Sequence, residues 1–202
     1  MAEIGASANI NVAQALQLIS AQIEATPKQL ALAADRALKK TCKWATFHMT
    51  RELSQVTGIV GKALKLRFSM KKVGTSYILW VGTKPIVAEL AGSARMNARG
   101  VRVRSHQFDS AFIASMYGQD NAVWIRAKKN REYGYQTTAL KRKPNPNRLP
   151  AHLQGRFPVQ HLAISIADEA AELMKRFEPR IEAEFQKKLK QELNYAANVE
   201  GE

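Results

Sequence analysis

The sequence predicts an α+β protein in which a small, mostly antiparallel sheet packs on a long helix, with long helices in the N-terminal and C-terminal parts of the chain. Two patterns predict this class. Apolar residues recur every three or four positions over 30–57 and again over 166–193, as on one face of a helix. Over 65–71 they alternate with polar residues, as in a half-buried strand. The 202 residues are interpreted as a single domain over 1–202, with long helices appended to its core.

Residues 11–57 are predicted to form N-terminal helices. The segment 11–25 has an apolar face, and Thr26 followed by Pro27 is typical of an N-cap and a first helical position. The second helix then continues to about Thr57. Gly58 is expected to end it, because glycine is the usual residue just beyond a helix.

Residues 58–127 are predicted to form the sheet region. After a short helical turn at 59–64, the basic strand 65–71 and the aromatic and β-branched run 77–81 are expected to form a hairpin around Gly74. Further short apolar runs are flanked by glycine, proline or asparagine, which are typical of breaks between strands. The strands expected from these runs are 86–90, 101–103, 122–126 and 157–161.

Residues 128–156 are interpreted as a basic, proline-containing arm that forms a long mobile loop. Pro144, Pro146 and Pro150 disfavour a helix or a central strand there. Residues 157–202 are predicted to contain a strand and a terminal amphipathic helix, which Pro179 is expected to kink.

Positive charge is concentrated in the middle of the chain. Between Leu53 and Ala167 there are nineteen lysines and arginines but only four acids, so this region carries +15 and accounts for the formal charge of +14, the rest of the chain being nearly balanced. Such a field attracts polyanions or acidic protein surfaces. The residues expected to form the basic surface are Arg102, Arg104, Lys128, Lys129, Arg131, Lys141, Arg142 and Lys143.

The titratable residues do not form a recognisable catalytic pattern. The four histidines have no histidine or cysteine at the helical spacing of metal ligands, and Cys42 falls on an apolar stripe that is typical of a core thiol. We therefore expect neither an enzyme nor a cofactor or metal site. The sequence also lacks a signal peptide and an apolar run of about 20 residues, so a soluble protein without membrane contact is expected.

One glycine-rich loop suggests an alternative function. Gly58-Ile59-Val60-Gly61-Lys62 lacks the glycine and the hydroxyl residue that a Walker phosphate loop requires. The same Gly-x-x-Gly between two helices is similar to the loop with which KH domains clamp a nucleic-acid backbone. A turn that simply ends the preceding helix is the favoured interpretation. The alternative is a nucleic-acid-binding protein that uses this loop and the basic middle region.

Several motifs follow one another along much of the chain. They are Ser54-Gln55-Val56-Thr57-Gly58-Ile59, the basic strand 65–68, Lys84-Pro85-Ile86, Gly100-Val101-Arg102-Val103, Ala111-Phe112-Ile113-Ala114 with Gly118, the strand 123–126, and Arg156-Phe157-Pro158-Val159 before the terminal helix. In order and spacing they resemble the phage and prophage minor tail protein Z family. The chain departs from that family in having Ser110 where a glycine usually precedes Ala111, and in inserting roughly 128–154.

The resemblance implies a non-enzymatic virion structural protein of the tail-completion kind. Such a protein acts in the neck of a tailed bacteriophage, where it joins the tail tube to the head connector, and is assembled in the host bacterial cytoplasm. The expected partners are further copies of the chain in a ring of six, the tail tube or tail-terminator protein, and the connector. DNA passing through the ring is a further candidate partner.

Two segments are expected to supply the subunit interface. Phe112 and Ile113 lie between small residues, and Phe112 is expected to anchor the segment in the core or in an interface. The apolar stripe of the terminal helix is longer than a small sheet can cover, which predicts contact with a neighbouring subunit. The expected interface residues are Phe112, Ile113, Phe177, Ile181, Phe185, Leu189, Glu178 and Glu182.

Overall fold

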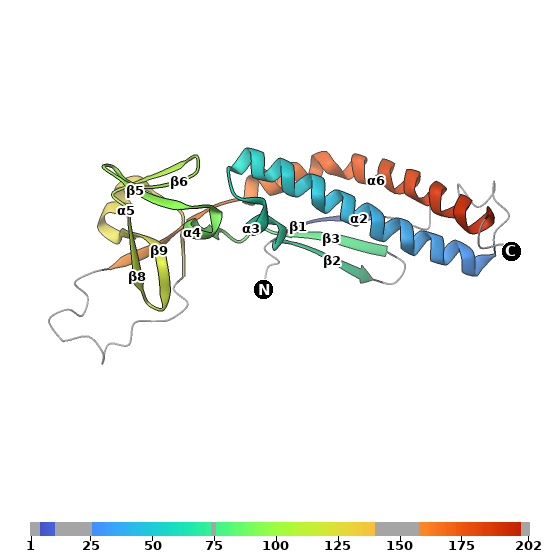
Figure 1. The fold of residues 1–202 in the computed structure, drawn as a ribbon, viewed down its shortest axis with the longest axis horizontal. Helices are drawn as coiled ribbons and strands as arrows, with labels where there is room; N and C mark the ends of the chain where they lie inside the picture. Colours follow the sequence, from blue (N-terminus) through green and yellow to red (C-terminus); the bar gives the residue numbers. More distant parts are fainter. Residues whose placement is uncertain (1–4, 11–25, 74–75, 140–157, 199–202) are drawn as a thin grey trace. The chain divides into compact units, whose positions relative to one another are not determined.

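The computed structural model describes residues 5–10, 26–73, 76–139 and 158–198, and it confirms the α+β class with antiparallel sheets and two long helices (Figure 1). The predicted helix 11–25, the turn at Gly74 and residues 140–156 of the predicted arm lie outside the described residues. Where one domain was predicted, the chain divides into two compact units. Unit 1 comprises Met1–Leu53, Lys65–Gly82 and Glu169–Glu202, and unit 2 comprises Ser54–Leu64 and Thr83–Asp168.

Unit 1 combines a sheet with two long helices. Figure 1 shows α2 and α6 side by side, with the strands of this unit lying along α2. The described strands pair antiparallel in the order β1-β3-β2. The elements are β1 (Gly5–Ile10), α2 (Pro27–Thr57), β2 (Phe68–Val73), β3 (Ser76–Gly82) and α6 (Ala167–Asn198).

The hairpin between β2 and β3 was predicted correctly, but the half-buried character of its first strand was not. Tyr77, Leu79 and Val81 alternate along β3 and are buried. Leu66, by contrast, lies outside β2 and is 83% exposed, and Met70 is 43% exposed. Among the described residues β2 is an edge strand that pairs only with β3, and almost all of its side chains are exposed.

The two long helices run antiparallel and share a core. Lys40 on α2 forms an ion pair with Glu192 on α6, while Glu52 near the other end of α2 pairs with Arg176 and Arg180. The apolar stripe of α6 was predicted to extend beyond its cover and to face a neighbouring subunit. It is instead covered within the chain. Its buried residues include Phe177, Ile181, Phe185, Leu189 and Leu193. The helix is assigned continuously through Pro179, which lies on its exposed side.

Unit 2 contains two further antiparallel sheets among the described residues. One has the order β5-β6-β7, and the other has the order β10-β11-β9-β8 with β4 also paired to β11. The elements are α3 (Gly61–Lys65), β4 (Ile86–Val87), α4 (Ala88–Ala91), β5 (Ala94–Asn97), β6 (Gly100–Val103), β7 (His106–Asp109), β8 (Phe112–Met116), β9 (Gln119–Arg126), α5 (Ala127–Tyr133), β10 (Thr137–Thr138) and β11 (Val159–Ile164).

Two predictions within unit 2 were wrong. Of the predicted strand 86–90, only Ile86 and Val87 are extended, because the next residues form α4 and bury Ala88 and Ala91. The beginning of the predicted arm is helical as α5. The prolines that argued against a helix all lie beyond residue 143, and Gly134, with a φ of 69°, closes the helix by donating its N–H to the carbonyl of Asn130.

Tight turns connect the strands of unit 2. Among the described residues, the non-glycine residues with positive φ are Arg104, Ser110, Tyr117 and Asn121, and all four lie in this unit. Such a conformation costs about 1–2 kcal/mol for a residue with a Cβ atom. The turns are therefore fixed by strand pairing, and local preference alone does not predict them.

Among the described residues, no helix combines the length and the apolar composition that a membrane crossing requires.

Candidate functional site

An exposed cluster of aromatic side chains lies on α2 in unit 1. The ring centroid of Trp44 lies 4.8 Å from that of His48, and His48 contacts Phe47 edge-on at 5.2 Å. The Phe47 side chain is 63% exposed although it stands in the middle of a long helix. Together with Arg180 of α6, these three residues form what we term the aromatic patch.

Arg180 is held in a fixed position beside the aromatic rings. Its guanidinium lies 4.1 Å from the ring centroid of Phe177 and 5.9 Å from that of Trp44. Its Nη1 also forms a 2.8 Å ion pair with Oε1 of Glu52. An arginine stacked on aromatic rings and anchored by a carboxylate loses little further freedom on binding, which favours a protein contact at this place.

Exposed charged residues lie on both long helices of unit 1. Lys43 and Arg51 are exposed one helical turn before and after Phe47. On α6, Glu178 and Glu182 are also exposed and are separated by the same four positions. Unit 1 thus presents an aromatic residue between two bases on one helix, and a pair of acids on the other.

Arginines occupy the outer face of the three-stranded sheet in unit 2. The register places Arg95 on β5 directly opposite Arg102 on β6, and Arg102 opposite Gln107 on β7. Arg104 follows in the two-residue turn between β6 and β7. All three arginines are exposed. We term Arg95, Arg102 and Arg104 the arginine face.

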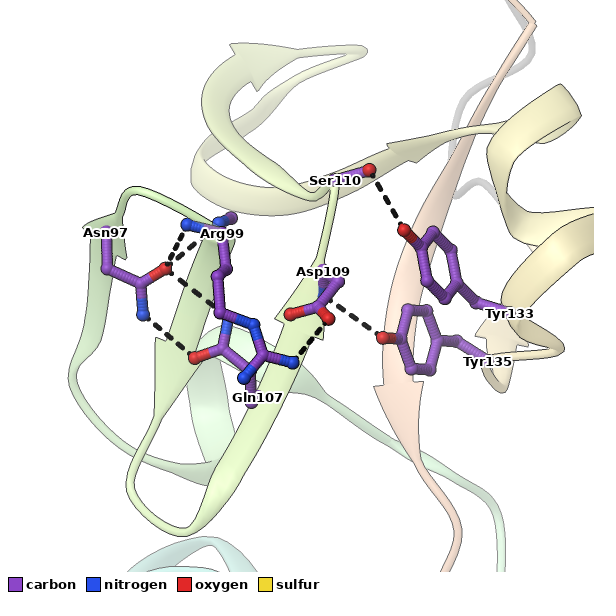
Figure 2. Close-up of polar contacts among 8 residues, drawn as sticks. Asn97, Arg99, Gln107, Asp109, Ser110, Tyr133 and Tyr135 are labelled. Carbon is purple, nitrogen blue, oxygen red and sulfur yellow. Dashed lines mark hydrogen bonds and ion pairs between the residues drawn. The ribbon is translucent and has the colours of Figure 1, made fainter.

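Hydrogen bonds order the other end of the same sheet (Figure 2). Oδ1 of Asn97 accepts hydrogen bonds from the backbone N–H groups of Arg99 and Gly100, and Nη2 of Arg99 forms a 2.6 Å ion pair with Oδ2 of Asp109. The Arg99 guanidinium holds the pKa of the Asp109 carboxyl below its usual range. The backbone N–H of Asp109 donates to the Tyr135 hydroxyl. Asp109 therefore neutralises Arg99 and leaves the arginine face uncompensated.

A buried histidine forms a polar contact with an acid in unit 2. Nε2 of His161 lies 2.7 Å from Oε1 of Glu89, and its ring stacks on Trp124 with centroids 4.7 Å apart. His161 is only 4% exposed, and no hydroxyl or thiol of the described residues hydrogen-bonds to it. Its burial, stacking and single contact favour a structural role.

The position of the cysteine thiol also favours a structural role over a reactive one. Cys42 is buried on α2, as predicted, and burial raises the pKa of its thiol to about 11. It is therefore protonated at neutral pH. Among the described residues, no group of three or more histidine, cysteine or acidic side chains could hold a metal ion.

The Gly-x-x-Gly loop packs within unit 2. Gly58 has a φ of 67° at the end of α2, and a Cβ atom there would lie 2.2 Å from Oγ of Ser105. Ile59 is fully buried, and the Val60 N–H donates to the Ala91 carbonyl. These contacts occupy the loop, which favours its role as a helix end over the KH-like clamp.

The structure separates the predicted site residues into different settings. Phe112 and Ile113 are half-buried in β8, and Phe112 lies opposite Trp124. Burial leaves Phe177, Ile181, Phe185 and Leu189 no apolar area for a neighbouring subunit, whereas Glu178 and Glu182 are exposed. Of the predicted basic surface, Arg102, Arg104, Lys128, Lys129 and Arg131 are exposed, and Lys141, Arg142 and Lys143 lie outside the described residues.

Sequence reasoning missed Phe47 and Arg95. Phe47 could have been found, because it is an aromatic residue off the apolar stripe that includes Cys42, Ala45 and Met49. Arg95 could not, because its position opposite Arg102 depends on strand register.

Comparisons of the chain with protein-family models, with curated proteins and with solved structures find no match.

Proposed function

We propose that this chain is a non-enzymatic virion structural protein that forms a ring in the neck of a tailed bacteriophage and joins the tail tube to the head connector. The observation that carries this proposal is the backbone at Ser110. The minor tail protein Z family, which the sequence resembles, usually has glycine before the Ala-Phe-Ile-Ala motif. Ser110 has a φ of 59°, a conformation that favours glycine. The backbone at position 110 thus has the conformation that the usual glycine of the family would adopt most easily, although this chain has serine there.

Two glycines of the same resemblance also stand where the backbone requires them. A Cβ atom at Gly100 would lie 2.2 Å from the carbonyl oxygen of Phe108, and Gly58 adopts a φ of 67° against Ser105. A side chain would clash with the backbone at Gly100 and is disfavoured by the conformation at Gly58. The motifs of the resemblance therefore support a shared fold of unit 2.

The aromatic patch of unit 1 is the surface that we propose for assembly. Residues that dominate protein interfaces are enriched in tryptophan, tyrosine and arginine. Trp44 contacts Arg180 and His48, and His48 contacts the exposed Phe47. A ring requires two different surfaces on each subunit. We assign Phe47, between Lys43 and Arg51, to one surface and Glu178 with Glu182 to the other. The aromatic residue supplies affinity, and the opposite charges set the register.

Sedimentation of the full chain tests this proposal. The wild type is expected to form a closed oligomer of the 22.5 kDa chain. Phe47→Ser should dissociate it, because the substitution removes the exposed aromatic anchor. Leu32→Ser is the matched control, since Leu32 is also exposed on α2 at 45%. A wild type that stays monomeric at all concentrations, or equal oligomeric masses for both variants, would contradict the assignment.

A further inference from the structure

We propose that the arginine face of unit 2 binds the phosphodiester backbone of nucleic acid without reading its sequence. This inference is independent of ring assembly, because it uses residues of unit 2 alone and applies to the monomer.

The first argument is an uncompensated pair of like charges. Arg95 and Arg102 are directly opposite in the β5-β6 pair, where the Cβ atoms of such residues lie about 4.5–5.5 Å apart. Like charges at this spacing oppose strand pairing. Among the described residues, no acid pairs with either guanidinium. An anion bound between them would remove the repulsion.

The second argument is preorganisation of the guanidinium groups. Nε of Arg102 donates a 3.0 Å hydrogen bond to the backbone carbonyl of Arg104, which orients the guanidinium and leaves its terminal amino groups available. Arg104 has a φ of 53° in its tight turn. Its aliphatic stem lies over Gly92, where a Cβ atom would be 2.7 Å from Cγ and 2.8 Å from Cδ. The absence of a side chain at Gly92 therefore makes room for the arginine.

The third argument is that three of the five acids of unit 2 are already engaged. Asp109 pairs with Arg99, Glu132 with Lys129 and Glu89 with His161. The sequence of unit 2 contains fifteen lysines and arginines and five acids, so its bases outnumber its acids three to one. A surface of one sign attracts a polyanion from a distance.

The chemistry of the face favours nucleic acid over an acidic protein. The row that includes Arg95, Arg102 and Gln107 is polar, whereas protein interfaces have an apolar centre. Protein–DNA interfaces are more polar and more positively charged. A second copy of the chain is also a poor partner, because unit 1 contains sixteen bases and twelve acids and is itself positive. Arginine forks match the geometry of phosphate oxygens.

Fluorescence anisotropy with the full chain and a labelled mixed-sequence DNA duplex tests the proposal. In the double variant Arg95→Gln and Arg102→Gln, affinity at about 0.1 M salt should fall roughly tenfold, and the slope of log K against log salt should decrease by about two. The control is Lys71→Gln with Lys190→Gln, which removes the same charge from exposed positions of unit 1. It should change affinity less than about twofold.

A second variant separates geometry from charge and from folding. Arg95→Lys with Arg102→Lys should keep the salt slope but lower the affinity, because lysine lacks the guanidinium fork. Circular dichroism shows whether each variant folds. Equal losses in the Gln variant and the control, or no binding by the wild type at about 0.05 M salt, would overturn the proposal. A competition experiment compares polyglutamate with unlabelled DNA at equal total charge. If polyglutamate displaces the labelled DNA with equal efficiency, the face recognises acidic protein and the proposal is wrong.

Discussion

The Tyr77 hydroxyl donates a 2.6 Å hydrogen bond to Oδ1 of Asp35, which links strand β3 to helix α2 in unit 1. Nζ of Lys39 lies 2.6 Å from Oδ2 of the same carboxylate, and Nζ of Lys72 lies 2.8 Å from Oδ1. These donors, with Lys39 the largest cause, hold the pKa of Asp35 well below its usual range. One carboxylate therefore contributes to the contact between the sheet and the helix.

Asp35→Ala is expected to lower the free energy of unfolding by about 1–2 kcal/mol at pH 7, because it leaves the buried Tyr77 hydroxyl without an acceptor. The pKa of Asp35 is lower in the folded than in the unfolded state, so its contribution is present above about pH 4 and is lost as pH falls toward the folded pKa. Urea unfolding at pH 7, 5 and 3 measures this. The difference in free energy of unfolding between the wild type and Asp35→Ala should be equal at pH 7 and pH 5 and smaller at pH 3. The exposed Asp120→Ala is the control, and an undiminished difference at pH 3 would contradict the argument.

His161→Ala is expected to destabilise the protein by about 2–4 kcal/mol, because it removes the stack on Trp124 and leaves Glu89 without its partner. A double variant, His161→Phe with Glu89→Met, replaces both polar groups by apolar ones. Its loss of stability should be about 1–2 kcal/mol smaller than the summed losses of His161→Phe alone and Glu89→Met alone. A double-mutant cycle from chemical denaturation measures this coupling, and strictly additive effects would show that the two residues do not interact.

Two substitutions at turns of unit 2 should have opposite effects on stability. Ser110→Gly relieves a positive φ and should raise the free energy of unfolding by about 0.5 kcal/mol. Gly100→Ala should lower it by at least about 2 kcal/mol, because the added Cβ atom would lie 2.2 Å from the Phe108 carbonyl. Thermal unfolding distinguishes the two, and the same sign for both would contradict the backbone description.

Phe112→Ala and Phe177→Ala should lower the free energy of unfolding by different amounts. Phe177 is fully buried, so its truncation should lower the free energy of unfolding by about 3–5 kcal/mol. Phe112 is half-buried, so about 2 kcal/mol is expected for a side chain that loses roughly half as much apolar contact. Guanidinium unfolding of both variants tests the difference, and equal costs would show that Phe112 is a full member of the core.

The long helices could be predicted because their signals are local. An apolar stripe, the proline at the start of α2 and Gly58 beyond its end all lie within a few residues of what they specify. The cover of the α6 stripe could not be predicted in the same way. It depends on pairing between residues such as Lys40 and Glu192, which are 152 positions apart. Without that pairing, the stripe was interpreted as a surface for a neighbouring subunit.

The candidate site was only partly predictable for a similar reason. The excess of basic residues is visible in the sequence, and Arg102 and Arg104 were expected on the surface. The turn between β5 and β6 places Arg95 opposite Arg102. In this turn Oδ1 of Asn97 accepts hydrogen bonds from the backbone N–H groups of Arg99 and Gly100. This turn lacks the Asn-Gly or Asp-Gly pair that usually marks a hairpin, so the register was not apparent.

Electron microscopy of the purified chain mixed with phage tail tubes tests the central claim most directly. A ring-forming tail-completion protein should appear as a ring closing one end of each tube. It should be lost with Phe47→Ser and retained with Leu32→Ser, because only the first substitution removes the proposed anchor. Tube ends that remain bare at saturating wild-type protein would contradict the proposed function.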